Sequence, residues 1–240
     1  MMLLRMQGGA PVKAGFHRRW PYDVAAAPPT PPVHAGRYAS DLLEAAGIPV
    51  RTRQPVLHVA PDARAAAAEL MREHGLEAGR FAVFMPGCAP EGYLKRWGTD
   101  RFAALVEATV PTLAHRVALV GGPDEAEVCA ELAHRLPQQT VNLCGQTGLL
   151  DIVPLCESAR FIVSNDTGTA HLASASGQPL CVICGPTDPR RVLPLGPSVV
   201  SAQADLACIN CYRKHCDYHA CMTLVTPQDV LRALASGGAR

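Results

Sequence analysis

The sequence predicts an α/β protein with a parallel sheet and flanking helices, and three observations lead to this prediction. From Phe81 onward, short apolar runs rich in Val, Ile and Leu alternate with longer amphipathic stretches, which is typical of a parallel sheet covered by helices. The loops after these runs contain glycine, proline and polar residues, as expected where parallel strands end at one edge. With 240 residues, 48% of them hydrophobic, the chain can bury an ordinary core.

The N-terminal segment, residues 1–34, lacks a steady hydrophobic period. Its last part, Ala27-Pro28-Pro29-Thr30-Pro31-Pro32, cannot continue a helix and favours extended backbone. We therefore interpret this segment as a linker or strap, and we expect the main domain to cover residues 35–240.

Apolar residues at helical spacing, several followed by a glycine that can end a helix, predict the helices of the main domain. These helices are expected at 38–46, 61–74, 99–113, 124–136, 149–158, 168–176 and 227–235. The short apolar runs between them predict the strands. The strands are expected at 81–85, 116–120, 140–143, 161–164 and 180–184.

The charge balance excludes binding to nucleic acid or to an anionic membrane by charge alone. The 22 basic and 21 acidic residues leave a formal net charge of +1, so any anion has to be bound locally. The apolar run at the N-terminus is too short for a signal peptide, and no stretch approaches a membrane span. We expect a cytoplasmic protein, peripheral at most to an inner membrane, with its ten cysteines reduced.

Four loops are expected to open on the carboxyl edge of the sheet, where open parallel sheets bind their ligands. They are Pro86-Gly87-Cys88-Ala89, Gly121-Gly122-Pro123-Asp124-Glu125, Asn165-Asp166-Thr167-Gly168 and Gly185-Pro186-Thr187-Asp188-Pro189. The Asp-Thr-Gly turn joins a strand to a helix, so its free N–H groups can bind a phosphate. Gly168 allows close approach, while Asp166 and His171 can bind hydroxyls or phosphate oxygens. The alternative is a simple helix N-cap with a partly buried histidine.

Several charged residues lie beside these loops. Lys95 and Arg96, with Trp97, precede the helix at 99–113 and can bring positive charge to the same edge, although a solvated surface pair is the alternative. Glu125 follows two glycines and either caps its helix or receives ribose hydroxyls. Arg190 and Arg191 follow Asp188-Pro189 and can neutralise a diphosphate or lie on the surface.

Together these motifs resemble glycosyltransferase family 9, the ADP-heptose:lipopolysaccharide heptosyltransferases and their relatives. The shared motifs, in the family's order, are Lys95-Arg96-Trp97, Gly121-Gly122-Pro123-Asp124-Glu125, Ser164 to His171, and Gly185-Pro186-Thr187-Asp188-Pro189. The likeness extends over about residues 80–234 and is more specific as a set than in any one piece. It implies the Rossmann-like C-terminal, donor-binding half of a GT-B glycosyltransferase. Residues 1–34 would then be the remnant of an N-terminal domain and its linker.

The resemblance implies a site for a nucleotide-diphosphate sugar, ADP-heptose first among them. Lys95 would contact the diphosphate and Glu125, beside Gly122, the ribose. The other implied donor-binding residues are Pro86, Gly87, Asp166, Thr167, Gly168, His171, Thr187 and Asp188. Transfer would invert the anomeric carbon and need no cofactor, and its general base would come from an N-terminal domain that has no counterpart here. The acceptor, lipopolysaccharide core or a related lipid-linked or protein acceptor, stays open.

A cluster of cysteines precedes the last predicted helix, in a loop at 205–222. Cys208, Cys211, Cys216 and Cys221 are interleaved with His215 and His219, and such spacing can close a zinc or iron site. Some relatives in the family hold iron in a similar stretch. The alternative is a set of free thiols.

Three functions remain as hypotheses. The first is a glycosyltransferase that is complete or depends on a partner chain or oligomer. The second is a non-catalytic sugar-nucleotide-binding module. The third is a Rossmann-type oxidoreductase or a small metal-binding protein, which is disfavoured because no Gly-x-Gly-x-x-Gly follows the first strand.

Overall fold

The computed structural model describes residues 2–5, 11–16, 22–26 and 34–237. Contacts between residues divide the chain into two compact units. The first comprises Met1–Pro55 with Arg190–Val192, and the second Val56–Pro189 with Leu193–Arg240. Each unit is described by itself.

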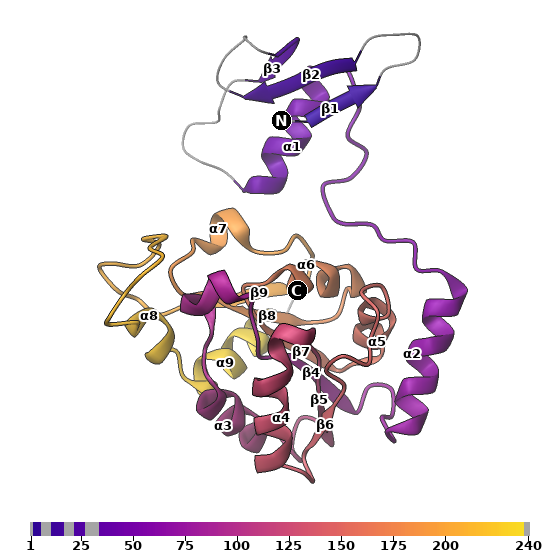
Figure 1. The fold of residues 1–240 in the computed structure, drawn as a ribbon, viewed down its shortest axis with the longest axis vertical. Coiled ribbons are helices and arrows are strands. Elements are labelled where there is room, and N and C mark those ends of the chain that lie inside the picture. Colours follow the sequence, from indigo (N-terminus) through magenta and orange to yellow (C-terminus); the bar gives the residue numbers. More distant parts are fainter. Residues whose placement is uncertain (1, 6–10, 17–21, 27–33, 238–240) are drawn as a thin grey trace. The chain divides into compact units, whose positions relative to one another are not determined.

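The first unit contains a small sheet with one helix (Figure 1). Strands β1 (Met2–Arg5) and β2 (Pro11–Phe16) pair antiparallel, and β3 (Val24–Ala26) pairs parallel to β2. Helix α1 (Ala35–Ala45) contacts β2 and β3. It ends before Gly47, whose φ of 77° is easily adopted by glycine.

The described part of residues 1–34, interpreted from the sequence as a linker or strap and as the remnant of a domain, forms three paired strands. Each strand there has three to six residues, too few to show a period, and the strands are stabilised by pairing with one another. Because α1 contacts this sheet, the compact unit extends to Pro55, beyond the predicted boundary at residue 34. The proline-rich segment at 27–32 lies outside the described residues.

The second unit is built on a six-stranded sheet in the order β6-β5-β4-β7-β8-β9, in which every pair is parallel. The strands are β4 (Phe81–Met85), β5 (Arg116–Leu119), β6 (Thr140–Asn142), β7 (Phe161–Asn165), β8 (Leu180–Ile183) and β9 (Val199–Ala202). The chain runs outward from β4 to β6, then returns to the other side of β4 and continues to β9. The switch point of this doubly wound fold therefore lies between β4 and β7, where ligands bind beyond the carboxyl ends.

Helices cover both faces of this sheet (Figure 1). One layer contains α3 (Thr99–Thr109), α4 (Ala126–Arg135) and α9 (Pro227–Gly237). The other contains α2 (Pro61–Glu73), α5 (Ile152–Ser158) and α6 (Gly168–Ala173). Short turns complete the unit: η1 (Pro90–Lys95), η2 (Pro123–Glu125), η3 (Ser174–Ser176) and α8 (Ala220–Thr223). The short helix α7 (Pro189–Val192) contains Pro189 of the second unit and Arg190–Val192 of the first.

The alternation of side chains along each strand divides the interior into two cores. In β4, Ala82 and Phe84 face the layer of α3, α4 and α9, while Phe81, Val83 and Met85 face the opposite layer. Every residue of β4 is buried. This explains why a strand covered on both faces appears in the sequence as a continuous apolar run.

The predicted α/β fold with a parallel sheet is confirmed, and the element ends differ for local reasons. Strand β4 has its predicted bounds, and the other four predicted strands differ by one residue at one end. Helix α3 ends four residues early because Val110, which precedes Pro111, is extended with ψ of 131°. The edge strand β9 was not predicted, since Val199 to Ala202 is too short a run to show a period.

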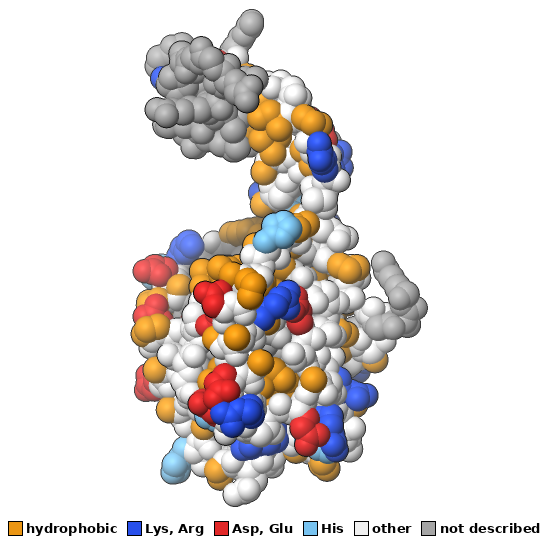
Figure 2. Space-filling model, turned by 90° about the vertical axis from the view of Figure 1, so that its right-hand side faces the viewer, with side chains coloured by type: hydrophobic (Ala, Val, Ile, Leu, Met, Phe, Trp, Pro, Cys, Tyr) orange, Lys and Arg blue, Asp and Glu red, His pale blue; other side chains and the backbone are white. Residues whose placement is uncertain are grey.

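The surface of the second unit mixes charges of both signs. On the face shown in Figure 2, basic and acidic side chains lie beside one another. Arg64 pairs with Glu157, and Arg72 pairs with Glu69. Within the described ranges, no helix is both long enough and apolar enough to cross a membrane.

We expect Phe84→Ala to destabilise the second unit by about 3–5 kcal/mol, because it leaves a cavity under the sheet. The Phe84 ring is fully buried and lies 6.1 Å from the ring of Phe102 and 6.3 Å from that of Phe161. Urea unfolding followed by circular dichroism measures the loss. Leu149→Ala is the control, since Leu149 is 63% exposed, and equal losses for the two variants would contradict the assigned core.

Candidate functional site

The candidate site begins at the end of β7, where Asn165 joins the loops on both sides of the switch point. Its side-chain nitrogen donates to the carbonyl oxygens of Pro86 at 2.7 Å and Gly87 at 3.0 Å. Its side-chain oxygen accepts from the backbone N–H of Trp97 at 3.2 Å. The loop after β4 and the start of α3 are thereby attached to β7. Asn165 is not among the predicted site residues, and it is fully buried.

A buried carboxylate follows Asn165 and draws two side chains to it. Asp166 is only 5% exposed. Its Oδ2 lies 2.8 Å from Lys95 Nζ and accepts from the hydroxyl of Thr187 at 2.8 Å. Three predicted site residues, from three different loops, therefore meet at one oxygen atom. The Lys95 side chain is 30% exposed, so its ammonium group is half-buried at the edge of the site.

The turn after Asp166 starts α6 without a side-chain cap. Thr167 stands at the N-cap with extended backbone, but its side chain makes no capping hydrogen bond. Its hydroxyl instead pairs with that of Thr169 at 2.7 Å. The alternative of a simple side-chain N-cap at this position is therefore not what the structure shows. Gly168 and His171 are both exposed, and the backbone N–H groups of this first turn can receive an anion.

Glu125 is packed against two glycines. Its Oε2 accepts from the N–H of Gly122 at 2.6 Å. A Cβ atom on Gly87 would overlap the Glu125 side chain, and one on Gly121 would lie 2.7 Å from Glu125 Cβ. The absence of side chains at Gly87 and Gly121 therefore allows the carboxylate to lie between the loops after β4 and β5. The observed contact is the helix-capping one.

Pro86 and Gly87 also border a cavity of about 200 Å³. Residues at or near the starts of α3 and α4 complete its lining, namely Arg96, Gly98, Thr99, Asp124, Glu127, Val128 and Glu131. Arg96 donates to the carbonyl oxygen of Cys88 at 2.9 Å and is exposed, so the alternative of a surface arginine fits it better than a place beside Asp166.

The cysteines nearest to the site are protonated thiols. Burial raises the pKa of Cys88, with the nearby Asp166 adding to the effect and Lys95 opposing it. Burial likewise raises the pKa of Cys184 well above its ordinary value, and the Asp166 charge adds to the effect. Neither thiol is therefore suited to act as a nucleophile near neutral pH.

The loop at 205–222 packs on the site from one side. The hydroxyl of Tyr212 accepts from the N–H of Asp188 at 3.1 Å. The backbone N–H of Tyr212 donates to the carbonyl oxygen of Pro186 at 2.9 Å. Gln203, which lies just before this loop, also donates to the carbonyl oxygen of Thr187 at 2.9 Å. His219 contacts the carbonyl oxygen of Leu94 at 2.7 Å. This loop thus holds both the loop after β8 and the turn before Lys95, a role that its cysteine spacing does not indicate.

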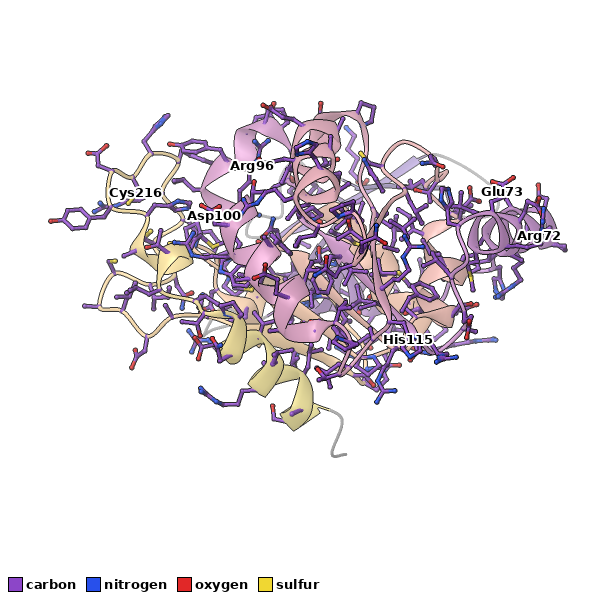
Figure 3. All side chains as sticks on the ribbon, turned by 90° about the horizontal axis from the view of Figure 1, so that it is seen from below. Arg72, Glu73, Arg96, Asp100, His115 and Cys216 are labelled. Carbon is purple, nitrogen blue, oxygen red and sulfur yellow. The ribbon has the colours of Figure 1, made fainter. Side chains whose placement is uncertain are left out.

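The four cysteines of this loop differ in their exposure, and Cys221 packs against the hydrophobic core. Cys208 and Cys211 are exposed, and Cys216 and Cys221 are half-buried. In Figure 3, Cys216 lies in the loop at one margin, with Arg72 and Glu73 of α2 at the opposite margin. Within the described residues, no three His, Cys, Asp or Glu side chains gather as a metal site requires. As placed, the thiols do not fit a metal ion, and the predicted zinc or iron remains a prediction.

The sequence also offers two arginines for a diphosphate. Arg190 and Arg191 belong to α7 and are grouped with the first unit, so a contact with a diphosphate stays a prediction. The predicted donor-binding residues lie at the carboxyl edge of one sheet, on or just after the loops that follow β4, β5, β7 and β8. The contacts that join these loops come from residues with ordinary polar side chains, Asn165, Gln203 and Tyr212.

Comparisons with known proteins show the family to which the chain is similar. A family model described as glycosyltransferase family 9 (heptosyltransferase) matches residues 3–221. Lipooligosaccharide heptosyltransferase 2 of Haemophilus influenzae is 29% identical over 216 residues, which cover 85% of this chain and 62% of that protein. The structure of E. coli ADP-heptose LPS heptosyltransferase II has a TM-score of 0.67 at 26% identity, covering 85% of this chain and 62% of that one. A glycosyltransferase family 9 structure from Veillonella parvula has a TM-score of 0.72 at 18% identity, with 89% and 62% covered, which shows likeness of fold. The chain thus spans 62% of the length of each of these proteins.

We expect the thiols to react in two classes with an aromatic disulfide reagent. Cys208 and Cys211 are exposed and should react first. Cys156, Cys181 and Cys184 should react only on unfolding, because burial hides them and raises their pKa values, that of Cys181 to about 12.

Absorbance at neutral pH, with and without guanidinium, measures the two classes. Equal rates for the loop thiols and the buried thiols would contradict the assigned burial. A first class that appears only after a chelator is added would show that the loop holds a metal.

Proposed function

The chain belongs to glycosyltransferase family 9, and on this premise we propose that its second unit binds a nucleoside diphosphate sugar as the donor half of a heptosyltransferase-type enzyme. The observation that carries the proposal is the meeting of Lys95, Asp166 and Thr187 at the switch point of the sheet. The Lys95 ammonium group has three N–H donors, so it can bind a diphosphate oxygen while it stays paired with Asp166. The name of the E. coli relative supports ADP-heptose as the donor, because it includes that sugar nucleotide.

Lys95 stabilises the leaving group in the proposed mechanism. A base removes a proton from an acceptor hydroxyl, and the resulting oxygen attacks the anomeric carbon as its bond to the diphosphate breaks. The electron pair of that bond leaves with the nucleoside diphosphate. The Lys95 ammonium group and the N–H groups of the turn at Thr167 and Gly168 stabilise the added negative charge, and they are preorganised to do so. No step requires a metal.

Glu125 and the loop after β5 receive the ribose in this proposal. The N–H of Gly122 holds Oε2, which leaves Oε1 to accept from ribose hydroxyls. The cap and the ribose contact are therefore compatible, since they use different oxygen atoms. Pro86 and Gly87 border the nucleoside from the loop after β4. His171, Thr187 and Asp188 lie nearest to the sugar and phosphates.

We assign no general base among these residues. Oδ2 of Asp166 is engaged by Lys95 and Thr187, and Oε2 of Glu125 by Gly122. The family resemblance places the base in the N-terminal half of such enzymes. Transfer itself, and a lipopolysaccharide-core or related acceptor, are therefore proposals that concern the whole protein.

The alternative function is a sugar-nucleotide-binding module that is inactive alone or depends on a partner chain. It is favoured by the length of the match, which is 62% of each relative. Release of ADP from ADP-heptose, with and without an acceptor, separates the two functions. Tight binding without release supports the module, while absence of binding to any ADP, UDP or GDP sugar contradicts both.

We expect Lys95→Ala to raise the Kd for ADP about tenfold to a hundredfold, the effect of losing one charged hydrogen bond. Isothermal titration calorimetry on the whole chain measures it. Lys214→Ala is the matched control, because Lys214 is an exposed lysine in the loop at 205–222. Unchanged affinity in Lys95→Ala would refute a role for this lysine at the diphosphate.

We expect Gly87→Ala to abolish discrimination between ADP and 2′,3′-dideoxy-ADP. The added methyl group would displace Glu125, so the ribose hydroxyls would lose their acceptor. The wild-type chain should prefer ADP about tenfold, the effect of one or two hydrogen bonds. Competition titrations with both nucleotides test this, and a preference retained in Gly87→Ala would show that Glu125 does not contact the ribose.

A further inference from the structure

We propose that Asn165 is a positioning residue, which holds Lys95 in register with the leaving diphosphate. The proposal rests on the proposed function, because it assigns a role within the same donor site. Asn165 is the last residue of β7 and is fully buried. It carries no charge and does not line the cavity at Pro86 and Gly87. Its action is therefore on other residues of the site.

The side-chain amide of Asn165 has only one orientation that satisfies its neighbours. Both of its N–H groups face carbonyl oxygens, those of Pro86 and Gly87, and its oxygen faces the N–H of Trp97. The reverse orientation would set oxygen against two oxygens and N–H against N–H. The amide therefore fixes three backbone groups from two segments that are far from β7 in the sequence.

Trp97 transmits this constraint to Lys95. Its indole ring is 1% exposed, donates to the carbonyl oxygen of Val225 at 2.9 Å, and packs edge-on against Phe102 at 5.1 Å. With both its backbone and its ring held, Trp97 is a fixed point two residues after Lys95. Because Trp97 is held, the backbone at Lys95, two residues earlier, is restrained. The ammonium group at the other end of the side chain lies 2.8 Å from Asp166 Oδ2. Asn165 and Asp166 are neighbours at the end of β7. The first restrains the backbone near Lys95 through Trp97, and the second binds its ammonium group.

This constraint bears on binding because a lysine side chain has many rotamers. Ordering it during donor binding would cost conformational entropy. In this site the ordering is already present before the donor arrives, so less is lost when the diphosphate binds. The same amide holds the loop after β4, which places Gly87 against Glu125. A single uncharged side chain thus aligns the lysine with the ribose-binding loop.

A double-mutant cycle tests the proposal, with ADP as the ligand in isothermal titration calorimetry. Asn165→Asp keeps an oxygen for Trp97 but loses both N–H donors, and Asn165→Ser shortens the side chain so that it cannot span the loops. We expect each variant to raise the Kd about tenfold in the wild-type background. In the Lys95→Ala background the same changes should raise it by less than about twofold, because the two residues act together.

The matched control is Thr140→Val. The Thr140 hydroxyl is buried and donates to the carbonyl oxygen of Leu136 at 2.8 Å, but it lies at the first residue of β6, on the opposite edge of the sheet. The Thr140→Val substitution should lower the midpoint of thermal unfolding without changing the Kd for ADP. Purely additive effects of Asn165 and Lys95, or a change in Kd for Thr140→Val as large as for Asn165→Ser, would overturn the proposal.

The outcomes separate this inference from the proposed function. If wild type binds ADP and Lys95→Ala weakens binding, the proposed function stands. Normal affinity in both Asn165 variants would then overturn the positioning role alone. If both variants fail to fold, Asn165 serves the stability of the fold, and the positioning role is also overturned. Absence of ADP binding by wild type would overturn the proposed function and, with it, this inference.

Discussion

Asp166 places a negative charge where almost no water reaches, and much of the site's arrangement follows from this. An ionised carboxylate that is 5% exposed is costly unless it is paired and hydrogen-bonded. Lys95 and Thr187 both bind its Oδ2, so the loops after β4 and β8 must converge on the end of β7. Asn165 then holds the backbone on which this convergence depends. Removing Lys95 would leave the buried charge of Asp166 without its cationic partner.

Close packing of backbone against side chains forms the rest of the site. Gly87 and Gly121 leave space for Glu125, while Gly185 leaves space for Met222 and for the carbonyl oxygen of Leu94. The loop at 205–222 is attached across the same edge through Tyr212 and His219. These contacts are to backbone groups, so they constrain loop position more than side-chain chemistry. The candidate site is therefore closely packed where it meets the sheet and exposed where His171 and Gly168 lie.

The structure also limits what this chain does by itself in the proposed function. One carboxylate oxygen of Asp166 is paired with Lys95, and one of Glu125 accepts from Gly122. These contacts suit binding of a leaving group better than activation of an acceptor. Two different tasks, charge neutralisation and proton removal, need groups of opposite character. In the proposed function the second unit neutralises the charge of the leaving group. The family resemblance places proton removal in another domain.

The sequence by itself determined the class of the main fold and the edge of the sheet at which the candidate site lies. Strands buried on both faces must be apolar throughout, so Phe81 to Met85 was visible without any structure. Because parallel strands end at one edge, the loops holding Asp166 and Thr187 could be assigned to the same side of the sheet. The family followed from the order of these loops.

Tertiary structure alone decided the strand order, the short strands and the partners of each side chain. Strands β1 to β3 and β9 gain their stability from pairing with distant residues, which leaves no periodic trace in three to six residues. Asn165 resembles any polar residue in the sequence, and its function depends on Trp97, 68 residues away, coming within hydrogen-bonding distance. Hydrogen bonds of this kind join residues that only the folded sheet makes neighbours, so no local pattern encodes them.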